Sequence, residues 1–93
     1  VKNLSGVYSA TFRDAGAAYV VDTKSDKKAA EVRWSRTNIA AIGSVRANGG
    51  NGDRAQGPYA SQPIRSLRNC KVNSNPFDPN ECGSVVWNPN IAG

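Results

Sequence analysis

The sequence predicts an all-β protein, a small single-domain antiparallel β-sandwich or barrel of about six strands, for three reasons. Short segments rich in β-branched and aromatic residues alternate between apolar and polar positions, which is the pattern of half-buried strands. Clusters of Gly, Asn, Asp and Pro, the usual turn residues, separate these segments. The length of 93 residues suits one domain, so we expect residues 1–93 to form a single unit.

The first two strands are predicted to form a hairpin. Residues 7–13 alternate and contain the strand formers Val, Tyr, Thr and Phe. Residues 17–22 repeat the pattern, and residues 14–16 between them have the composition of a turn. Two such segments joined by a short turn are typical of a β-hairpin.

Residues 29–36 are predicted to form the third strand. Ala30, Val32 and Trp34 alternate with charged and polar residues, so a strand would place all three on one face. The alanines at the start of the segment also have helix propensity, which leaves a short helix as the alternative.

Residues 39–46 leave two structures open. Their apolar residues are spaced by three, as in a helix, but eight residues with Gly43 in the middle make a poor isolated helix. A strand with a bulge or kink at Gly43 fits as well. The next segment, residues 47–62, is predicted to be a loop of about sixteen residues, and loops of this length are usually functional or disordered.

Two further strands complete the predicted fold. Residues 64–72 and 84–87 are predicted strands, and the polar residues 73–81 between them are predicted to form a loop. Packing rather than recognition is the expected role of the core aromatics. These are Tyr8, Phe12, Tyr19, Trp34 and Trp87.

The two cysteines, Cys70 and Cys82, are predicted to form a disulfide bond. Turn residues between them allow the chain to double back, and a bridge closing such a loop is worth about 3 kcal/mol. Reduced thiols are the alternative, whereas zinc is disfavoured because two cysteines without histidine supply half of a tetrahedral shell. Disulfides persist in oxidising compartments, and the chain starts at Val1 rather than Met. We therefore expect a secreted, extracellular protein whose leader has been removed.

The charge is basic and spread along the chain. Lysine and arginine total 12 and aspartate and glutamate total 7, which gives a net charge of +5 without any basic block. A block would indicate a nucleic-acid-binding arm, whereas scattered cations serve solubility or weak attraction to anionic cell surfaces. We therefore expect no specific nucleic-acid partner. No apolar run approaches the roughly 18 residues of a membrane span, so no transmembrane segment is expected.

The composition disfavours an enzyme. Histidine is absent, which excludes histidine bases, histidine-containing triads and the usual ribonuclease mechanism. The carboxylates are expected to be solvated surface groups, and the sequence cannot place any pair of them across a cleft. The glycine-rich residues 48–53 could form a calcium loop, but Asp53 is their only carboxylate, so a tight turn is favoured. No cofactor and no metal site is predicted.

A binding function remains, and the loops are the expected contact surface. A loop braced by a disulfide is preorganised, which reduces the entropy lost on binding, and Tyr and Arg are frequent hot-spot residues. The predicted binding residues are Arg54 and Tyr59 in the first long loop, and Phe77 and Asp78 in the disulfide loop. The predicted function is that of a secreted, cationic, non-enzymatic protein that binds a protein or cell-surface partner. It would act as an inhibitor of an extracellular enzyme or as an antimicrobial or toxin-like factor.

Three alternatives stay open. The chain could be a structural adaptor of a secreted assembly that pairs an edge strand, such as residues 7–13, with a partner strand. A hydrolase with a carboxylate-only mechanism is a further candidate. Phe77 could also fold back onto the sandwich instead of facing a partner, since large exposed apolar patches are unusual in stable monomers.

Four short segments carry a family resemblance: residues 20–26 (VVDTKSD), 30–34 (AEVRW), 64–70 (IRSLRNC) and 81–84 (ECGS). They are similar to segments of small secreted, disulfide-containing β-domain proteins of actinobacteria such as Streptomyces, most of them uncharacterised. This resemblance implies export and an all-β fold, and it implies no catalytic residues. Residues 64–68 also resemble the strand after the Greek-key corner of βγ-crystallin-type microbial domains, some of which are inhibitors or killer toxins. A βγ-crystallin-like Greek key is therefore the alternative fold.

Overall fold

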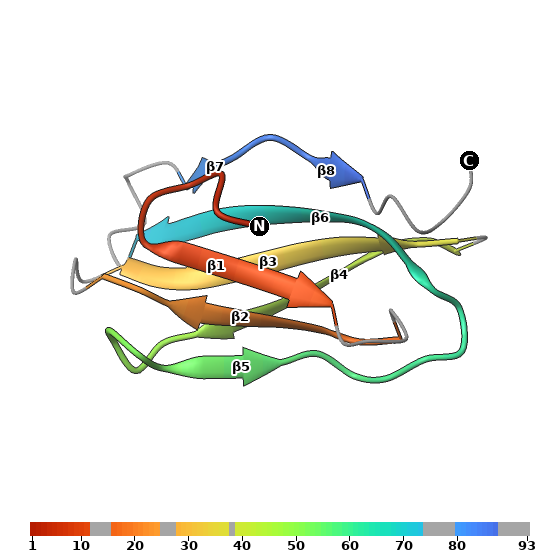
Figure 1. The fold of residues 1–93 in the computed structure, drawn as a ribbon, viewed down its shortest axis with the longest axis horizontal. Coiled ribbons are helices and arrows are strands. Elements are labelled where there is room, and N and C mark those ends of the chain that lie inside the picture. The colour runs from red at the N-terminus through yellow and green to blue at the C-terminus, as the bar shows by residue number, and fades with distance from the viewer. Residues whose placement is uncertain (12–15, 25–27, 38, 74–79, 88–93) are drawn as a thin grey trace.

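The structure, a computed structural model, describes residues 1–11, 16–24, 28–37, 39–73 and 80–87. Two antiparallel β-sheets pack against each other in it (Figure 1), which confirms the predicted small β-sandwich. The described residues form eight strands and no helix. The sequence predicted about six strands, and the two additional ones are short.

The smaller sheet has three strands in the order β1-β2-β5. β1 (Val7–Thr11) and β2 (Ala18–Asp22) pair antiparallel and form the predicted hairpin. β5 (Arg54–Gln56) pairs with the other edge of β2. Alternate residues of β2 are fully buried, so the period of two seen in the sequence is the period of burial.

The larger sheet has the order β4-β3-β6-β7, and β8 also pairs with β6. Its long central strands are β3 (Lys28–Arg36) and β6 (Ile64–Asn73). One edge is β4 (Ile39–Ala47), and the other consists of β7 (Glu81–Cys82) and β8 (Val86–Trp87). The helical alternatives for the segments that form β3 and β4 are therefore excluded.

An irregularity in β4 lies beside Gly43, where a strand with a bulge or kink was one of the two structures that the sequence left open. Trp34 pairs with Gly43 and Arg36 pairs with Ile39, so β3 advances by two positions while β4 advances by four. The additional residues of β4 form a bulge, which bends a strand and changes the direction of its side chains.

The core lies between the two sheets and is centred on Trp34. Its indole is 4% exposed and covers Gly43 of β4 and Gly57, which follows β5. A Cβ atom at either glycine would overlap the ring, so both positions need glycine for close packing. The other buried apolar residues of the core are Val7, Ala18, Val20, Ala30, Val32, Ala47, Ile64 and Leu67.

The other predicted core aromatics lie elsewhere. Trp87 is exposed, because the two-residue strand that carries it lies at the edge of the large sheet. Tyr8 and Tyr19 are half-buried on the outer face of the small sheet, where their rings meet edge to face at 6.3 Å. Phe12 lies outside the described residues.

The long segment predicted as a loop is partly ordered by pairing and by a buried cation. β5 lies inside it, which corrects the prediction of a sixteen-residue loop over 47–62. The guanidinium of Arg36 donates hydrogen bonds to the carbonyl oxygens of Gly16 and Gln62, both at 2.8 Å, and of Pro58 at 2.9 Å. Arg36 is 8% exposed, so these three carbonyls replace water around a buried charge.

The N-terminal segment lies along the outer edge of β1. The amide of Ser9 donates to the carbonyl of Val1 at 3.2 Å, and the amino group of Val1 donates back to the carbonyl of Ser9 at 2.6 Å. The buried hydroxyl of Ser9 donates to the side-chain oxygen of Asn69, whose amide donates to the Val1 carbonyl at 3.0 Å. The edge of β1, which the adaptor alternative would pair with a partner strand, is therefore already paired with Val1 at Ser9.

Candidate functional site

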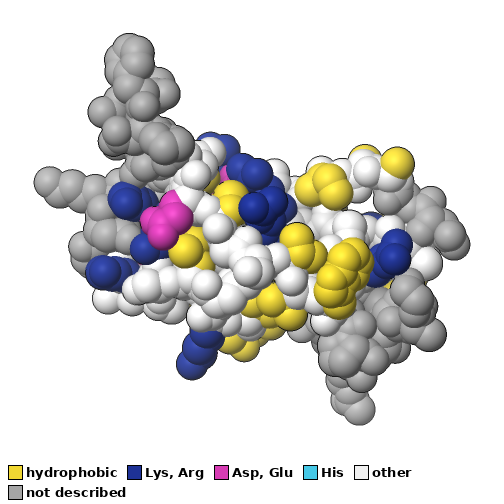
Figure 2. Space-filling view, turned by 90° about the horizontal axis from the view of Figure 1, so that it is seen from above, with side chains coloured by type: hydrophobic (Ala, Val, Ile, Leu, Met, Phe, Trp, Pro, Cys, Tyr) yellow, Lys and Arg dark blue, Asp and Glu magenta, His cyan; other side chains and the backbone are white. Residues whose placement is uncertain are grey.

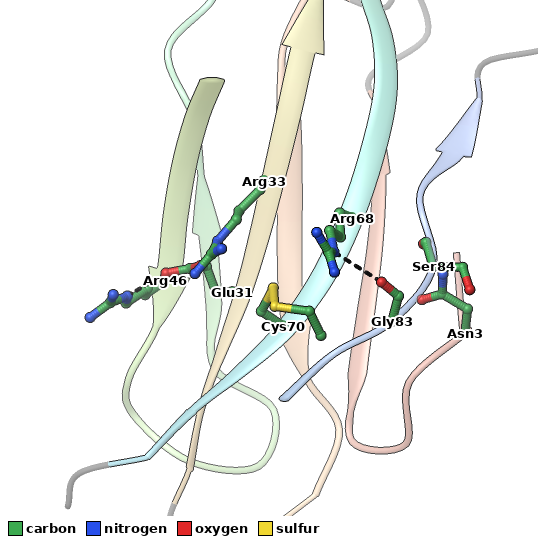
Figure 3. The surroundings of a disulfide bond; sticks show 9 residues. Asn3, Glu31, Arg33, Arg46, Arg68, Cys70, Gly83 and Ser84 are labelled. Atoms are coloured by element: carbon green, nitrogen blue, oxygen red, sulfur yellow. Dashed lines mark hydrogen bonds and ion pairs between the residues drawn. A yellow bond between two sulfur atoms is a disulfide. The ribbon is translucent and has the colours of Figure 1, made fainter. Parts of the chain in front are cut away.

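The outer face of the large sheet carries a cluster of arginines. Ala30, Val32 and Trp34 of β3 face the core, so the intervening residues face outward. The pairing registers place Arg46 of β4 beside Glu31 and Arg68 of β6 beside Arg33. Figure 3 shows Arg33 and Arg46 converging on Glu31, with Arg68 farther along the same face.

Glu31 is the buried centre of this cluster. Its carboxylate accepts hydrogen bonds from the Nε atoms of Arg33 and Arg46, both at 2.5 Å. Burial by itself would raise the pKa of Glu31, but the hydrogen bonds and charges of Arg46 and Arg33 outweigh it and hold the pKa below its usual value. Glu31 is 1% exposed and Asp22 is 2% exposed, so the expectation that the carboxylates are solvated surface groups is wrong for both.

The lowered pKa of Glu31 predicts a loss of stability in acid. Because the folded-state pKa lies below the ordinary value of 4.5, the unfolded state binds more protons in this range. The stabilisation is therefore complete above pH 4.5 and is lost as the pH falls through the folded-state pKa. We expect Glu31→Gln to lower the free energy of unfolding at pH 7 by about 1–2 kcal/mol, since both arginine partners remain partly solvated.

Urea denaturation of both proteins between pH 7 and pH 3 checks this prediction. The difference in stability between wild type and Glu31→Gln should shrink as the pH falls below 4.5. The control is Glu81→Gln, which removes an exposed carboxylate. If the difference in free energy of unfolding stays constant over the whole pH range, Glu31 is not an ionised group that accepts hydrogen bonds from two arginines.

A groove of about 240 Å³ crosses the outer face next to this cluster. Two arginines and two serines form its floor, and an isoleucine and a valine form apolar walls. We call it the arginine groove; it is lined by Arg33, Trp34, Ser35, Ile42, Ser66, Arg68 and Val85. The hydroxyls of Ser35 and Ser66 are hydrogen-bonded to each other at 2.5 Å. Arg33 and Arg68 are direct partners in the β3–β6 register, so two guanidinium groups lie beside the same groove.

Bulges on both neighbours of β3 flank this groove. On one side is the bulge of β4, which lies between the paired positions Gly43 and Ile39 and contains Ile42. On the other side Ser35 pairs with Ser66 while Arg36 pairs with Ile64, so Arg65 is an additional residue of β6. Bulges redirect side chains and are frequent beside functional sites. Together they give this end of the sheet an irregular, hollowed surface.

The disulfide fixes the far wall of the groove. Cys70 and Cys82 are direct cross-strand partners with Cα atoms 4.0 Å apart, so the predicted bond is confirmed. The next residue, Gly83, donates its amide to the Asn69 carbonyl at 2.8 Å and accepts from Nε of Arg68 at 3.0 Å (Figure 3). These contacts hold the segment between β7 and β8, which supplies the valine wall.

Exposed apolar side chains gather at the groove and next to it. Ile42 is 65% exposed and Trp87 is 60% exposed, and Val85 and Val86 are also exposed. The guanidinium of Arg65 lies 5.2 Å from the ring centre of Trp87, a cation–π contact. Figure 2 looks onto the edge that carries β7 and β8 and shows hydrophobic side chains lying among lysines and arginines. Exposed apolar groups clustered with arginine are typical of contact surfaces.

The structure does not bring two of the predicted binding residues, Arg54 and Tyr59, together. Arg54 lies opposite Val21 on the edge of the small sheet, with its guanidinium 5.5 Å from the ring centre of Tyr19. Tyr59 is 66% exposed and lies against Gly16, beyond the other end of β2. The two residues therefore lie near opposite ends of β2, one opposite Val21 and the other next to Gly16.

The other two predicted binding residues, Phe77 and Asp78, lie outside the described residues. The assignment of the four residues to a binding site stays a prediction. Sequence reasoning missed the arginine groove, although the alternation over residues 30–36 already placed Arg33 and Ser35 on one outward face. The missing information was the register, which decides that Ser66 and Arg68 stand beside them.

The glycine-rich residues 48–53 form a tight turn between β4 and β5. Gly50 and Gly52 have φ angles of 93° and 90°, which side chains rarely adopt. The carboxylate of Asp53 accepts a hydrogen bond from the amide of Gly49 at 2.8 Å, so it serves the turn. Among the described residues, no three His, Cys, Asp or Glu side chains gather as a metal site.

No family model, no curated protein and no solved structure matches this chain. The resemblance to small secreted actinobacterial proteins therefore stays a prediction. Within the described ranges, no helix has the length and apolar character needed to cross a membrane.

Proposed function

We propose that the protein is a secreted, non-enzymatic binding protein and that the arginine groove is its contact surface for another macromolecule. One observation carries the proposal: two arginines face the same hollow of a rigid sheet between exposed apolar walls, Ile42 and Val85. A disulfide in this part of the chain is compatible with an extracellular location. Inhibition of an extracellular enzyme or an antimicrobial action would each use such a surface.

The arginines have donors to offer a partner. Arg33 uses its Nε for Glu31, and Arg68 uses its Nε for the Gly83 carbonyl. Within the described residues, the terminal Nη groups of both arginines make no hydrogen bond. Guanidinium groups bind carboxylate, phosphate or sulfate through paired hydrogen bonds, so the groove favours an anionic group of the partner.

The site is also held rigid before binding. Its two arginines and two serines lie on the paired strands β3 and β6, the hydroxyls of Ser35 and Ser66 are hydrogen-bonded, and the disulfide holds the segment before β8. Preorganisation reduces the ordering entropy that binding must overcome. Trp and Arg, both present at this edge, are the residues most often found at the energetic centre of interfaces.

A pull-down with immobilised protein tests the proposal on secreted bacterial and fungal proteins and cell walls. Capture is compared at about 0.15 M and about 0.5 M salt, because screening removes weak long-range attraction but spares close contacts. We expect a partner that wild type holds at both salts and that Arg33→Gln/Arg68→Gln holds at least about tenfold less well, since each charge-assisted contact is worth about 1.5–3 kcal/mol.

Two controls make the result decisive. Arg54→Gln removes one exposed arginine from the small sheet, the same loss of charge as Arg68→Gln alone, and it should keep the partner. Arg68→Gln alone leaves the Glu31 ion pairs intact. It therefore replaces the double variant in the pull-down if the double variant does not fold. Loss of the partner from Arg54→Gln/Tyr59→Ala with retention by the groove variants would move the site to the loop residues and overturn the groove assignment.

A further inference from the structure

The arginine groove has a charge and a shape that together restrict its ligand. Its floor holds cations from β3 and β6, and the nearest described carboxylate, Glu31, already accepts from Arg33 and Arg46 with its two oxygens. No described acidic side chain lines the groove. An anion therefore meets two guanidinium groups there, and the one described carboxylate paired with either of them, Glu31, is shared between Arg33 and Arg46.

The walls of the groove are aliphatic on both sides. Ile42 from the bulge region of β4 stands at one side, and Val85 stands at the other. Aliphatic walls gain little from the hydroxyl-rich rings of a polysaccharide, but they bury the apolar side chains that flank an acidic residue in a protein segment. Because the site is a hollow rather than a plane, it receives a protruding side chain better than a flat lipid surface.

From this combination we propose that the arginine groove binds a carboxylate side chain, aspartate or glutamate, of a partner protein, with apolar neighbours of that residue packed on Ile42 and Val85. The carboxylate receives hydrogen bonds from the Nη groups of Arg33 and Arg68. The serine pair between the strands lies on the floor and can donate to the same anion. The inference rests on the proposed function and specifies the chemical class of its partner.

A random peptide library displayed on phage is the first probe. Selection on the immobilised wild-type protein should enrich peptides that share an acidic residue flanked by apolar residues. The strongest peptide is then synthesised together with a twin in which the acidic residue is replaced by its amide. Enriched peptides without a shared acidic residue would overturn the inference.

A double-mutant cycle then tests the contact itself. The two peptides are titrated by calorimetry into wild type and into Arg33→Gln/Arg68→Gln at about 0.15 M salt, where long-range attraction is screened. Replacing the carboxylate should weaken binding to wild type at least about tenfold and weaken binding to the variant less than about twofold, because only a direct contact makes the two changes non-additive. Equal losses in both proteins would contradict a direct contact.

Two other anionic ligands test whether the groove prefers a protein carboxylate. Heparin, a sulfated polysaccharide, and vesicles of anionic phosphatidylglycerol are measured against the same variants. If either one binds more tightly than the peptide at about 0.5 M salt and depends on Arg33 and Arg68, the carboxylate proposal is wrong while the groove remains the contact surface. If the groove variants bind every probe like wild type, the proposed function fails as well.

Discussion

Trp34→Ala is expected to lower the free energy of unfolding by about 3–5 kcal/mol, the usual loss when a buried aromatic side chain is truncated. The indole is 4% exposed and lies against Gly43 of the large sheet and against Gly57 beside the small one. Both glycines present bare backbone to the ring, so neither of them supplies a side chain that could fill the space that the ring leaves. Small domains are stable by about 5–15 kcal/mol in total, so this single change removes a large share.

The second tryptophan supplies a matched control for this prediction. Trp87 is exposed at the sheet edge, and its ring contacts a guanidinium rather than the core. Trp87→Ala should therefore lower the free energy of unfolding by less than about 1 kcal/mol. Urea denaturation followed by far-ultraviolet circular dichroism measures both variants. This signal reports the backbone structure, so it can be compared between proteins that differ in their tryptophans. Equal losses for the two variants would place the centre of the core elsewhere.

Removal of the disulfide is expected to lower the free energy of unfolding by about 3 kcal/mol, the chain-entropy estimate for a loop of this length. Cys70 and Cys82 are 12 residues apart in sequence and join β6 to the two-residue strand β7. A pair of two-residue strands makes few hydrogen bonds, so the covalent link is the main constraint on this edge. The double variant Cys70→Ala/Cys82→Ala tests the effect without leaving a reactive thiol.

Reduction of the wild-type protein provides the internal check. Dithiothreitol should lower the stability of wild type to that of the double variant and leave the variant unchanged. Hydrogen exchange at the amide of Gly83, which donates to Asn69, should accelerate in both reduced wild type and variant. A stability difference below about 1 kcal/mol would show that β7 and β8 are held by their packing rather than by the bridge.

Strand positions follow from local pattern, and this part of the fold was predictable from the sequence. The alternation in residues 7–13, 17–22 and 29–36 identifies β1, β2 and β3, because the period of two is a property of each strand alone. Turn residues between the first two strands also identify their hairpin. The bulge beside Gly43 was only one of two structures that the sequence left open for residues 39–46, because their apolar spacing also fitted a helix.

Features that depend on long-range pairing could not be predicted in this way. β5 has three residues, too few to show any period, and it exists because β2 offers an unpaired edge. Trp87 looks like a core residue by its type, but its place at the end of a short edge strand leaves it exposed. The arginine groove joins residues of β3, β4 and β6, and only the register reveals that they meet.

The buried guanidinium of Arg36 has a consequence for how the molecule assembles. Its carbonyl acceptors belong to Gly16, Pro58 and Gln62, which lie in segments on both sides of β3 in the sequence. An intermediate that buried this cation before all three segments had arrived would hold a charge with too few acceptors. Water therefore has to stay at this end of the sandwich until the chain from β5 to β6 has closed over it. The end of the molecule at Arg36 therefore becomes dry only once these three segments are in place, whichever strands pair first.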